Sequence, residues 1–226
     1  MRRALILLLF LVLFLPAGFA APCYGIKLPH KNNFSTGYQV HAILDRDLEG
    51  GFGSLRSTQH FFLISYGVFD WLSIDLKGGA GNIKQHPLNS DEIDYTSSFA
   101  GGYGFRIKMY DKGDTAVVFG FQHISVHPKT IHLGGVNHQA ILDDWQVSLL
   151  AGHNFNRFCP YAGMRFSRVD YIHWIEEDRK RRMSLPDEST GMVLGCDFSI
   201  SDKIWINAEG NLFNGRALSF SVNYEF

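Results

Sequence analysis

The chain has 226 residues and a formal net charge of -1 at pH 7, and 46% of its residues are hydrophobic and 14% aromatic. A near-neutral chain lacks the strongly basic charge of many nucleic-acid-binding proteins, which argues against nucleic-acid binding. Its length fits a single β-barrel domain. The 19 Phe, 9 Tyr and 23 Gly residues favour strands and tight turns over helices.

The first twenty residues predict a secretory signal peptide. Arg2 and Arg3 supply the positive end, residues 4–15 form an unbroken apolar run, and small residues precede the expected cleavage site. This run is too short for a spanning helix, which needs about twenty apolar residues. Residues 21–36 show no clear period and are interpreted as an N-terminal lead, so the expected domain covers residues 37–226.

The clearest pattern lies at the end of the chain. Apolar side chains at Leu218, Phe220, Val222, Tyr224 and Phe226 fall on one face of a strand, and polar side chains alternate with them. A closed membrane barrel accommodates such a strand, with lipid against the apolar face and a polar lumen inside. This ending resembles the closing strand of bacterial outer-membrane β-barrels. The resemblance implies that Tyr224 and Phe226 form the signal read by the barrel assembly machinery.

The same period of two recurs along the chain. The expected strands cover residues 38–45, 60–68, 72–80, 98–109, 115–127, 144–155, 159–171, 191–200, 204–212 and 216–226. Only the fifth has an ambiguous face, because Phe119 and Phe121 have the opposite parity to Ile124 and Val126, which a β-bulge would explain.

The connections between these strands alternate in length. Long connections are expected at residues 46–57, 82–94, 128–138 and 172–188, and the others are short turns. The Asn214-Gly215 hairpin, a short connection on the long side, is the exception. Outer-membrane barrels have long external loops and short periplasmic turns, which places both chain ends in the periplasm.

These patterns predict an all-β fold, a single closed antiparallel transmembrane β-barrel of about ten strands (between eight and twelve) in an up-and-down meander. The expected location is the outer membrane of a bacterium with two membranes. A soluble periplasmic barrel that binds an apolar ligand is the alternative, and it requires the apolar faces to point inward.

Several charged residues lie on the polar strand faces. The expected lumen charges are Asp75, Lys77, Arg106, Lys108, Glu209 and Glu225. They are interpreted as charges that satisfy one another in a lumen filled by side chains, with a charged constriction as the alternative. The expected function is structural, or a narrow passive pore for small solutes, without enzymatic activity, cofactor or metal.

One motif favours an enzyme instead. His123-Ile124-Ser125 is followed, on the next expected strand, by Asp143 and Asp144, and a Ser activated by a His that an acid orients is the logic of nucleophilic hydrolysis. The His-x-Ser pair resembles that of outer-membrane lipid A deacylases, which are small barrels. The alternative function is therefore an outer-membrane lipid hydrolase that uses His123 and Ser125. Whether these two side chains face the lipid or the lumen stays open.

Two further clusters are interpreted as solvated loop residues. His127, His132 and His138 have spacings that match no standard zinc motif. The basic run at residues 179–182 lies beside acidic residues, although it could also pair with lipopolysaccharide phosphates. The expected partners are thus the lipid bilayer, lipopolysaccharide and the assembly machinery, with no nucleic acid.

The chain contains 3 cysteines, Cys23, Cys159 and Cys196, without a C-x-x-C pair, which argues against a zinc ribbon or redox motif. Cys159 and Cys196 could pair in an oxidising compartment. Both lie in strand-like segments, however, and are interpreted as small apolar residues that fill space.

Overall fold

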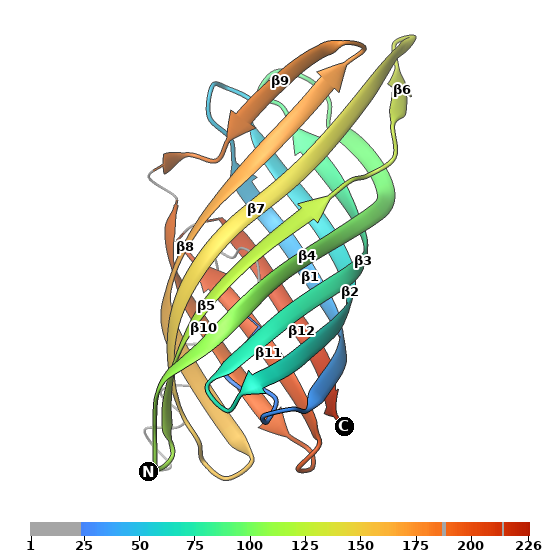
Figure 1. The fold of residues 1–226 in the computed structure, drawn as a ribbon. Coiled ribbons are helices and arrows are strands. Elements are labelled where there is room, and N and C mark those ends of the chain that lie inside the picture. The colour runs from blue at the N-terminus through green and yellow to red at the C-terminus, as the bar shows by residue number, and fades with distance from the viewer. Residues whose placement is uncertain (1–23, 187–188, 214) are drawn as a thin grey trace.

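The strands close into one antiparallel barrel (Figure 1). The computed structural model describes residues 24–186, 189–213 and 215–226, so the expected signal peptide lies outside the described residues. The strands are β1 (Phe34–Asp47), β2 (Ser54–Phe69), β3 (Leu72–His86), β4 (Ile93–Lys112), β5 (Thr115–Val126), β6 (Ile131–Leu133), β7 (Val136–His153), β8 (Phe158–Ile175), β9 (Asp178–Met183), β10 (Thr190–Ser199), β11 (Ile204–Leu212) and β12 (Arg216–Glu225).

Ten of these strands form the barrel wall, in the order β7-β5-β4-β3-β2-β1-β12-β11-β10-β8, and β8 returns to pair with β7. The wall is therefore the expected up-and-down meander, in which each strand pairs with its sequence neighbours and β1 with β12. Short turns join the strands at the lower end of Figure 1, here called the turn end, and longer connections lie at the opposite loop end. No helix among the described residues is long and apolar enough to cross a membrane.

At the loop end, two expected loops contain strands. Residues 128–138 include β6 and the start of β7, and residues 172–188 include the end of β8 and all of β9. The pairing of β7 with β8 continues as far as His138 and Ile175, well beyond the point where β10 leaves β8. β9 then pairs with the exposed edge of β8, which satisfies backbone groups that would otherwise be open. Figure 1 shows the β6–β7 and β8–β9 hairpins extending above the barrel.

The other long connections are also shorter than expected. β3 extends to His86 and β4 starts at Ile93, so the expected loop at residues 82–94 is mostly strand. Asn214 lies outside the described residues, and β12 begins two residues later, at Arg216.

The fifth strand contains no bulge, in contrast to the expectation. The register of β5 with β7 is continuous from Thr115 opposite His153 to Val126 opposite Leu142. Phe119 and Phe121 point outward, whereas Ile124 and Val126 point inward and are buried. Both faces of β5 carry apolar residues, because the lumen at this level contains an apolar cluster as well. The irregularity lies on the partner strand β4 instead, between residues 108 and 110.

The lumen near the loop end contains an apolar core as well as buried polar side chains. Its buried members come from most strands of the wall, although not from β10 or β11, and are Ile43, Leu48, Leu55, Phe61, Leu63, Ile83, Tyr95, Ala100, Ile124, Val126, Ala140, Leu142, Val169, Tyr171 and Ala217. The expectation of a purely polar lumen is therefore wrong for this half of the barrel, where buried polar side chains such as Arg46, Gln85 and Asp144 lie among the apolar ones. Because these side chains fill the interior, the inward faces of the strands pack against one another instead of lining a channel of water.

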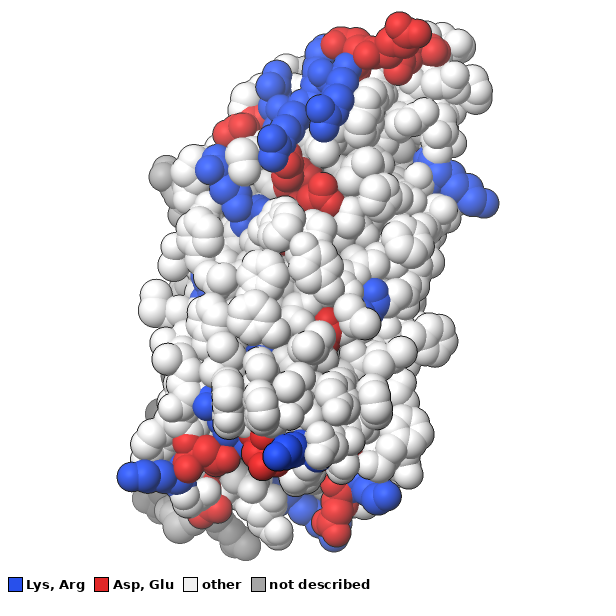
Figure 2. All heavy atoms as spheres, viewed as in Figure 1, with Lys and Arg blue, Asp and Glu red and all other residues white. Residues whose placement is uncertain are grey.

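The outward faces of the strands are also rich in apolar side chains. Phe62, Phe99, Tyr103, Met164 and Phe220 are among its exposed side chains. In Figure 2, Lys, Arg, Asp and Glu gather at the two ends of the barrel, and the band between them is nearly free of charge on the visible face. The soluble alternative required apolar faces that point inward, whereas these strands present them outward.

The closing strand β12 is paired on both sides. Its partners are β11 and β1, and the β1 pairing runs from Ser35 opposite Glu225 to Asp45 opposite Arg216. Tyr224 and Phe226 point outward and their rings are in edge contact, with centroids 5.1 Å apart. The Phe226 N–H donates to the Phe34 carbonyl at 2.9 Å, which joins the chain end to the first strand.

We expect that changing both Tyr224 and Phe226 to Ser lowers the amount of assembled barrel severalfold, because the strand that closes the barrel then lacks its terminal aromatic face. The measurement is the fraction of protein in isolated membranes whose gel band shifts on boiling. Changing Phe62 and Phe99 to Ser is the matched control, since both are outward aromatics away from the closing strand. Equal loss in the two variants would contradict a special role of the chain end.

Candidate functional site

The turn-end half of the lumen is filled by the chain's own N-terminal lead. Residues 24–33, here called the strap, lead into β1, and the first part of the strap, residues 24–29, runs inside the barrel. Ile26 and Leu28 are buried among inward side chains of the wall, which include Val118, Leu150 and Tyr161. The sequence indicated no structure here, although the alternation of Tyr24, Ile26 and Leu28 is a weak sign of an ordered segment.

Arg106 connects the strap to the barrel wall. Its Nε and Nη2 donate to the two carboxylate oxygens of Asp75 at 2.9 Å and 2.7 Å. Its Nη1 donates to the backbone carbonyls of Tyr24 at 3.1 Å and Lys27 at 2.7 Å. Arg106 and Asp75 are 4% and 0% exposed, so this bidentate pair is buried and uses its remaining donor on the strap.

Asp197 holds the same stretch from the opposite side. Its Oδ2 accepts from the backbone N–H groups of Ile26 at 3.2 Å and Lys27 at 3.3 Å, and Asn207 Nδ2 donates to its Oδ1 at 2.8 Å. A Cβ at Gly25, whose φ is +73°, would lie 2.7 Å from Asn207 Nδ2. Gly25 belongs to the strap, and only glycine fits at this position beside Asn207 and Asp197.

A third anchor lies at the turn end. Glu225 Oε1 accepts from the backbone N–H of His30 at 3.0 Å and from Asn33 Nδ2 at 3.1 Å, and it lies 2.7 Å from His30 Nδ1. Glu225 belongs to β12, so the closing strand itself binds the strap.

The other predicted lumen charges have separate partners. Lys77 Nζ donates to Gln39 and Gln122 at 3.2 Å and 3.0 Å, and lies 4.0 Å from the centroid of the Tyr24 ring. Glu209 accepts from the Tyr161 hydroxyl at 2.9 Å. Of the six predicted charges, Asp75 and Arg106 pair with each other.

Lys108 does not belong to this network. Its side chain is 22% exposed and pairs at 2.9 Å with Asp111 at the β4–β5 turn. Although its parity on β4 is inward, it lies at the rim of the barrel. There its ammonium group reaches the exposed carboxylate of the turn instead of the lumen.

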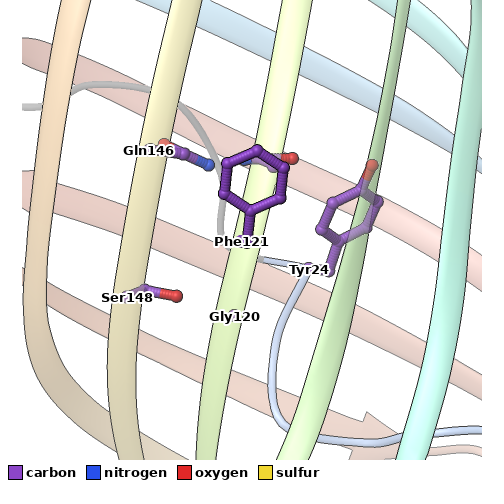
Figure 3. Close-up of a pocket in the computed structure, with 6 residues that line it drawn as sticks. Tyr24, Gly120, Phe121, Gln146 and Ser148 are labelled. Atoms are coloured by element: carbon purple, nitrogen blue, oxygen red, sulfur yellow. The ribbon is translucent and has the colours of Figure 1, made fainter.

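Little space remains beside the strap. Figure 3 shows Tyr24 facing Gly120 of β5 and Gln146 and Ser148 of β7, with Phe121 at the same level. The gap between these residues is too narrow to admit a sphere of the size of a water molecule. The strap and the wall therefore pack directly against each other.

Arg46 is a lumen residue that sequence analysis placed in a loop. It is buried, and its Nη2 donates to the Ser167 carbonyl at 3.0 Å and to Ser184 Oγ at 2.9 Å. A register shift between Ile43 and Arg46 reverses the parity of the strand there. A strict period of two could not find this residue.

The hydrolase candidates lie on the outer wall. His123, Ser125 and Asp143 have outward parity on β5 and β7, and Ser125 is directly opposite Asp143. Ser125 Oγ and His127 Nε2 are 2.8 Å apart, and His123 Nε2 is 3.5 Å from Asp143 Oδ1. Asp144 is separate from this cluster, since it points inward and accepts from Ser167 Oγ at 2.6 Å.

The histidines predicted to be solvated loop residues differ from one another. His132 is exposed on β6, and His127 follows β5 and contacts Ser125. His138 is buried on β7, with its Nδ1 3.4 Å from Nε2 of His173, so that prediction is wrong for His138. The reason is the long β7 strand, which continues inside the expected loop.

The basic run and the cysteines also have defined positions. Residues 179–182 belong to β9 rather than to a loop, and Arg181 pairs with Asp170. Cys159 and Cys196 are free thiols. They lie on neighbouring strands, but Cys159 faces the lumen and Cys196 faces outward, so a disulfide would need one strand to turn over.

No protein-family model and no curated protein sequence matches the chain. Among solved structures, the attachment invasion locus protein Ail of Yersinia pestis has a TM-score of 0.42 at 10% identity, over 88% of this chain and 100% of its own. The outer membrane protease OmpT from Escherichia coli has a TM-score of 0.42 at 10% identity, over 91% and 100%. The transport unit of the autotransporter AIDA-I from Escherichia coli has a TM-score of 0.47 at 11% identity, over 92% and 94%. With scores below 0.5, no conclusion about activity follows from these likenesses.

We expect Arg106→Ala to destabilise the barrel by about 3–5 kcal/mol, because it leaves the Asp75 carboxylate buried without its cation. The measurement is the temperature at which the gel band shifts from the folded to the unfolded position. Lys108→Ala is the control, since an exposed ion pair contributes about 0–1 kcal/mol. Similar shifts for the two variants would mean that the buried pair has no special weight.

Proposed function

We propose that the protein is an outer-membrane β-barrel whose lumen is plugged, and that its role in the membrane is structural rather than that of a pore. The outward apolar side chains and the charged ends suit a lipid environment around the middle of the wall. Its partners are the lipid bilayer, lipopolysaccharide and the barrel assembly machinery. Export through a cleaved signal peptide belongs to the same proposal.

The observation that carries this proposal is the strap. It is bound from three directions, by Arg106 of β4, Asp197 of β10 and Glu225 of β12. These anchors use main-chain groups of the strap, so they fix its backbone whatever solute is present. A structural role follows more directly from such a plug than passive permeation does.

Lipopolysaccharide is a suitable neighbour of the loop end. Arg179 and Arg181 of β9 have the same parity as the outward residues of β8, and the Arg179 guanidinium lies 5.4 Å from the centroid of the Trp174 ring. Guanidinium groups beside an aromatic ring at a membrane boundary suit contacts with lipid phosphates.

We expect purified protein to give no conductance steps in planar bilayers, because the strap and the apolar core leave no aqueous path. Thiol labelling provides the structural control, in a chain whose native cysteines are replaced by Ser. A polar maleimide should label Lys31→Cys, at the exposed part of the strap, at least tenfold faster than Ile26→Cys inside the barrel. Regular conductance steps from the wild-type chain, or equal labelling of both sites, would refute the plugged state.

A further inference from the structure

Two buried histidines connect the hairpins that rise above the barrel at the loop end (Figure 1). His138 lies on β7, which pairs with β6, and His173 lies on β8, which pairs with β9. In the β7–β8 ladder His138 is opposite Ile175 and Ala140 is opposite His173, so the two histidines are diagonal neighbours on the inward face. They are 9% and 5% exposed, so a positive charge on either ring would be held away from water.

The two rings face each other through one nitrogen each. His138 Nδ1 and His173 Nε2 are 3.4 Å apart, and the ring centroids are 5.6 Å apart. A hydrogen bond between two imidazole nitrogens needs one donor and one acceptor, so only one of the two facing nitrogens carries a hydrogen. The other nitrogen of His173, Nδ1, is buried and has no hydrogen-bond partner among the described residues.

Only one hydrogen-bonded arrangement leaves Nδ1 of His173 without a hydrogen. In this arrangement both rings are neutral, and His173 Nε2 donates to His138 Nδ1. If His173 is charged, both of its nitrogens carry hydrogens. If His138 is charged instead, it donates to His173 Nε2, and the neutral His173 must hold its hydrogen on Nδ1. Every charged form of the pair therefore buries a donor without an acceptor, which is costly.

The neighbouring groups do not offset a positive charge on the pair. Lys180 of β9 is directly opposite His173, and the nearby carboxylate of Asp178 already pairs with Lys180 at 3.1 Å. The rings of Tyr171 on β8 and Tyr95 on β4 lie 5.9 Å and 6.4 Å from that of His173, and phenols are uncharged at neutral pH. Protonation would thus add a cation beside an existing one.

Two further charged groups at this end are directed elsewhere. The Glu176 carboxylate accepts from the backbone N–H of Asn137 at 2.7 Å. The Arg182 guanidinium lies 4.6 Å from the centroid of the Phe52 ring. Neither group is therefore placed to balance a charge on the facing nitrogens of the two histidines.

The pKa of His173, which lies above the membrane-spanning wall, reflects these surroundings. Burial and then the His138 ring and Lys180 lower this pKa from 6.5 to about 4, against the opposing effect of Asp178. In an opened hairpin the ring would regain its ordinary pKa. The closed state is therefore favoured in full above about pH 6.5, and this advantage is lost as the pH falls toward 4.

We propose that His138 and His173 form an acid-sensitive clasp, which holds the two hairpins together at neutral pH and releases them in an acidic medium. On release, the loop-end parts of β7 and β8 separate, and β9 loses its fixed partner edge. The wall below stays closed, because the β7–β8 ladder continues as far as Gly152 opposite Tyr161. The clasp goes beyond the plugged barrel and does not depend on it, since the strap lies in the turn-end half of the lumen.

The test is hydrogen exchange of backbone amides, followed by mass spectrometry on the purified full chain in detergent micelles at pH 7.5 and pH 4.5. Each rate is divided by the intrinsic exchange rate at that pH. We expect the protection of residues 170–183 to fall at least about tenfold at pH 4.5, because a histidine with a pKa of about 4 when closed and 6.5 when open favours opening by about 10–100-fold there. Residues 217–223 of β12 should keep their protection at both pH values.

His173→Gln should remove this response to pH, because its amide can still donate to His138 Nδ1 but does not titrate. His173→Phe, which fills the space without titrating, should remove it as well and guards against a packing defect of the first variant. His132→Gln is the matched control, since His132 is an exposed histidine on β6 outside the pair. This control should respond as the wild type does. Equal protection of residues 170–183 at both pH values in the wild type, or an undiminished response in both His173 variants, would overturn the proposal.

Discussion

The structure depends on the closure of its backbone hydrogen bonds. A wall surrounded by lipid has no water to satisfy open N–H and C=O groups, so every strand needs a partner on both sides. The pairing of β1 with β12 meets this requirement for the two ends of the chain. Where β10 leaves β8 near the loop end, β9 pairs with the free edge of β8.

Closure creates an interior that must be filled. Near the loop end, inward apolar side chains from most strands fill it together with buried polar groups such as Arg46. Near the turn end the strap packs against a second apolar cluster and also binds charged groups of the wall. Arg106 illustrates the division of roles, since its carboxylate partner comes from the wall and its carbonyl partners come from the strap. Removing the strap would leave Nη1 of Arg106 without its two carbonyl acceptors, which is unfavourable in a buried site.

The two faces of β5 show how one strand serves both environments. Gln122 and Ile124 point inward and belong to the filled lumen, whereas His123 and Ser125 point toward the surroundings of the barrel. The period of two separates these roles along a single segment. Side chains on the outer wall and side chains in the lumen can therefore vary independently, residue by residue.

The sequence by itself determined the barrel, because an alternation of faces is a local property that each strand displays in its own residues. The outward face of β12 and the turns beside Gly113 and Lys203 could be read in this way. It did not reveal the inward position of Arg46, because a bulge reverses the local parity, nor the role of Asp197, whose partners are backbone groups of the strap. Only the tertiary structure decided which polar residues meet, because Arg106, Asp197 and Glu225 are brought around one segment by closure of the wall. It also decided that His123 and Ser125 face outward, since the inward apolar core that sets the parity of β5 forms only in the closed barrel.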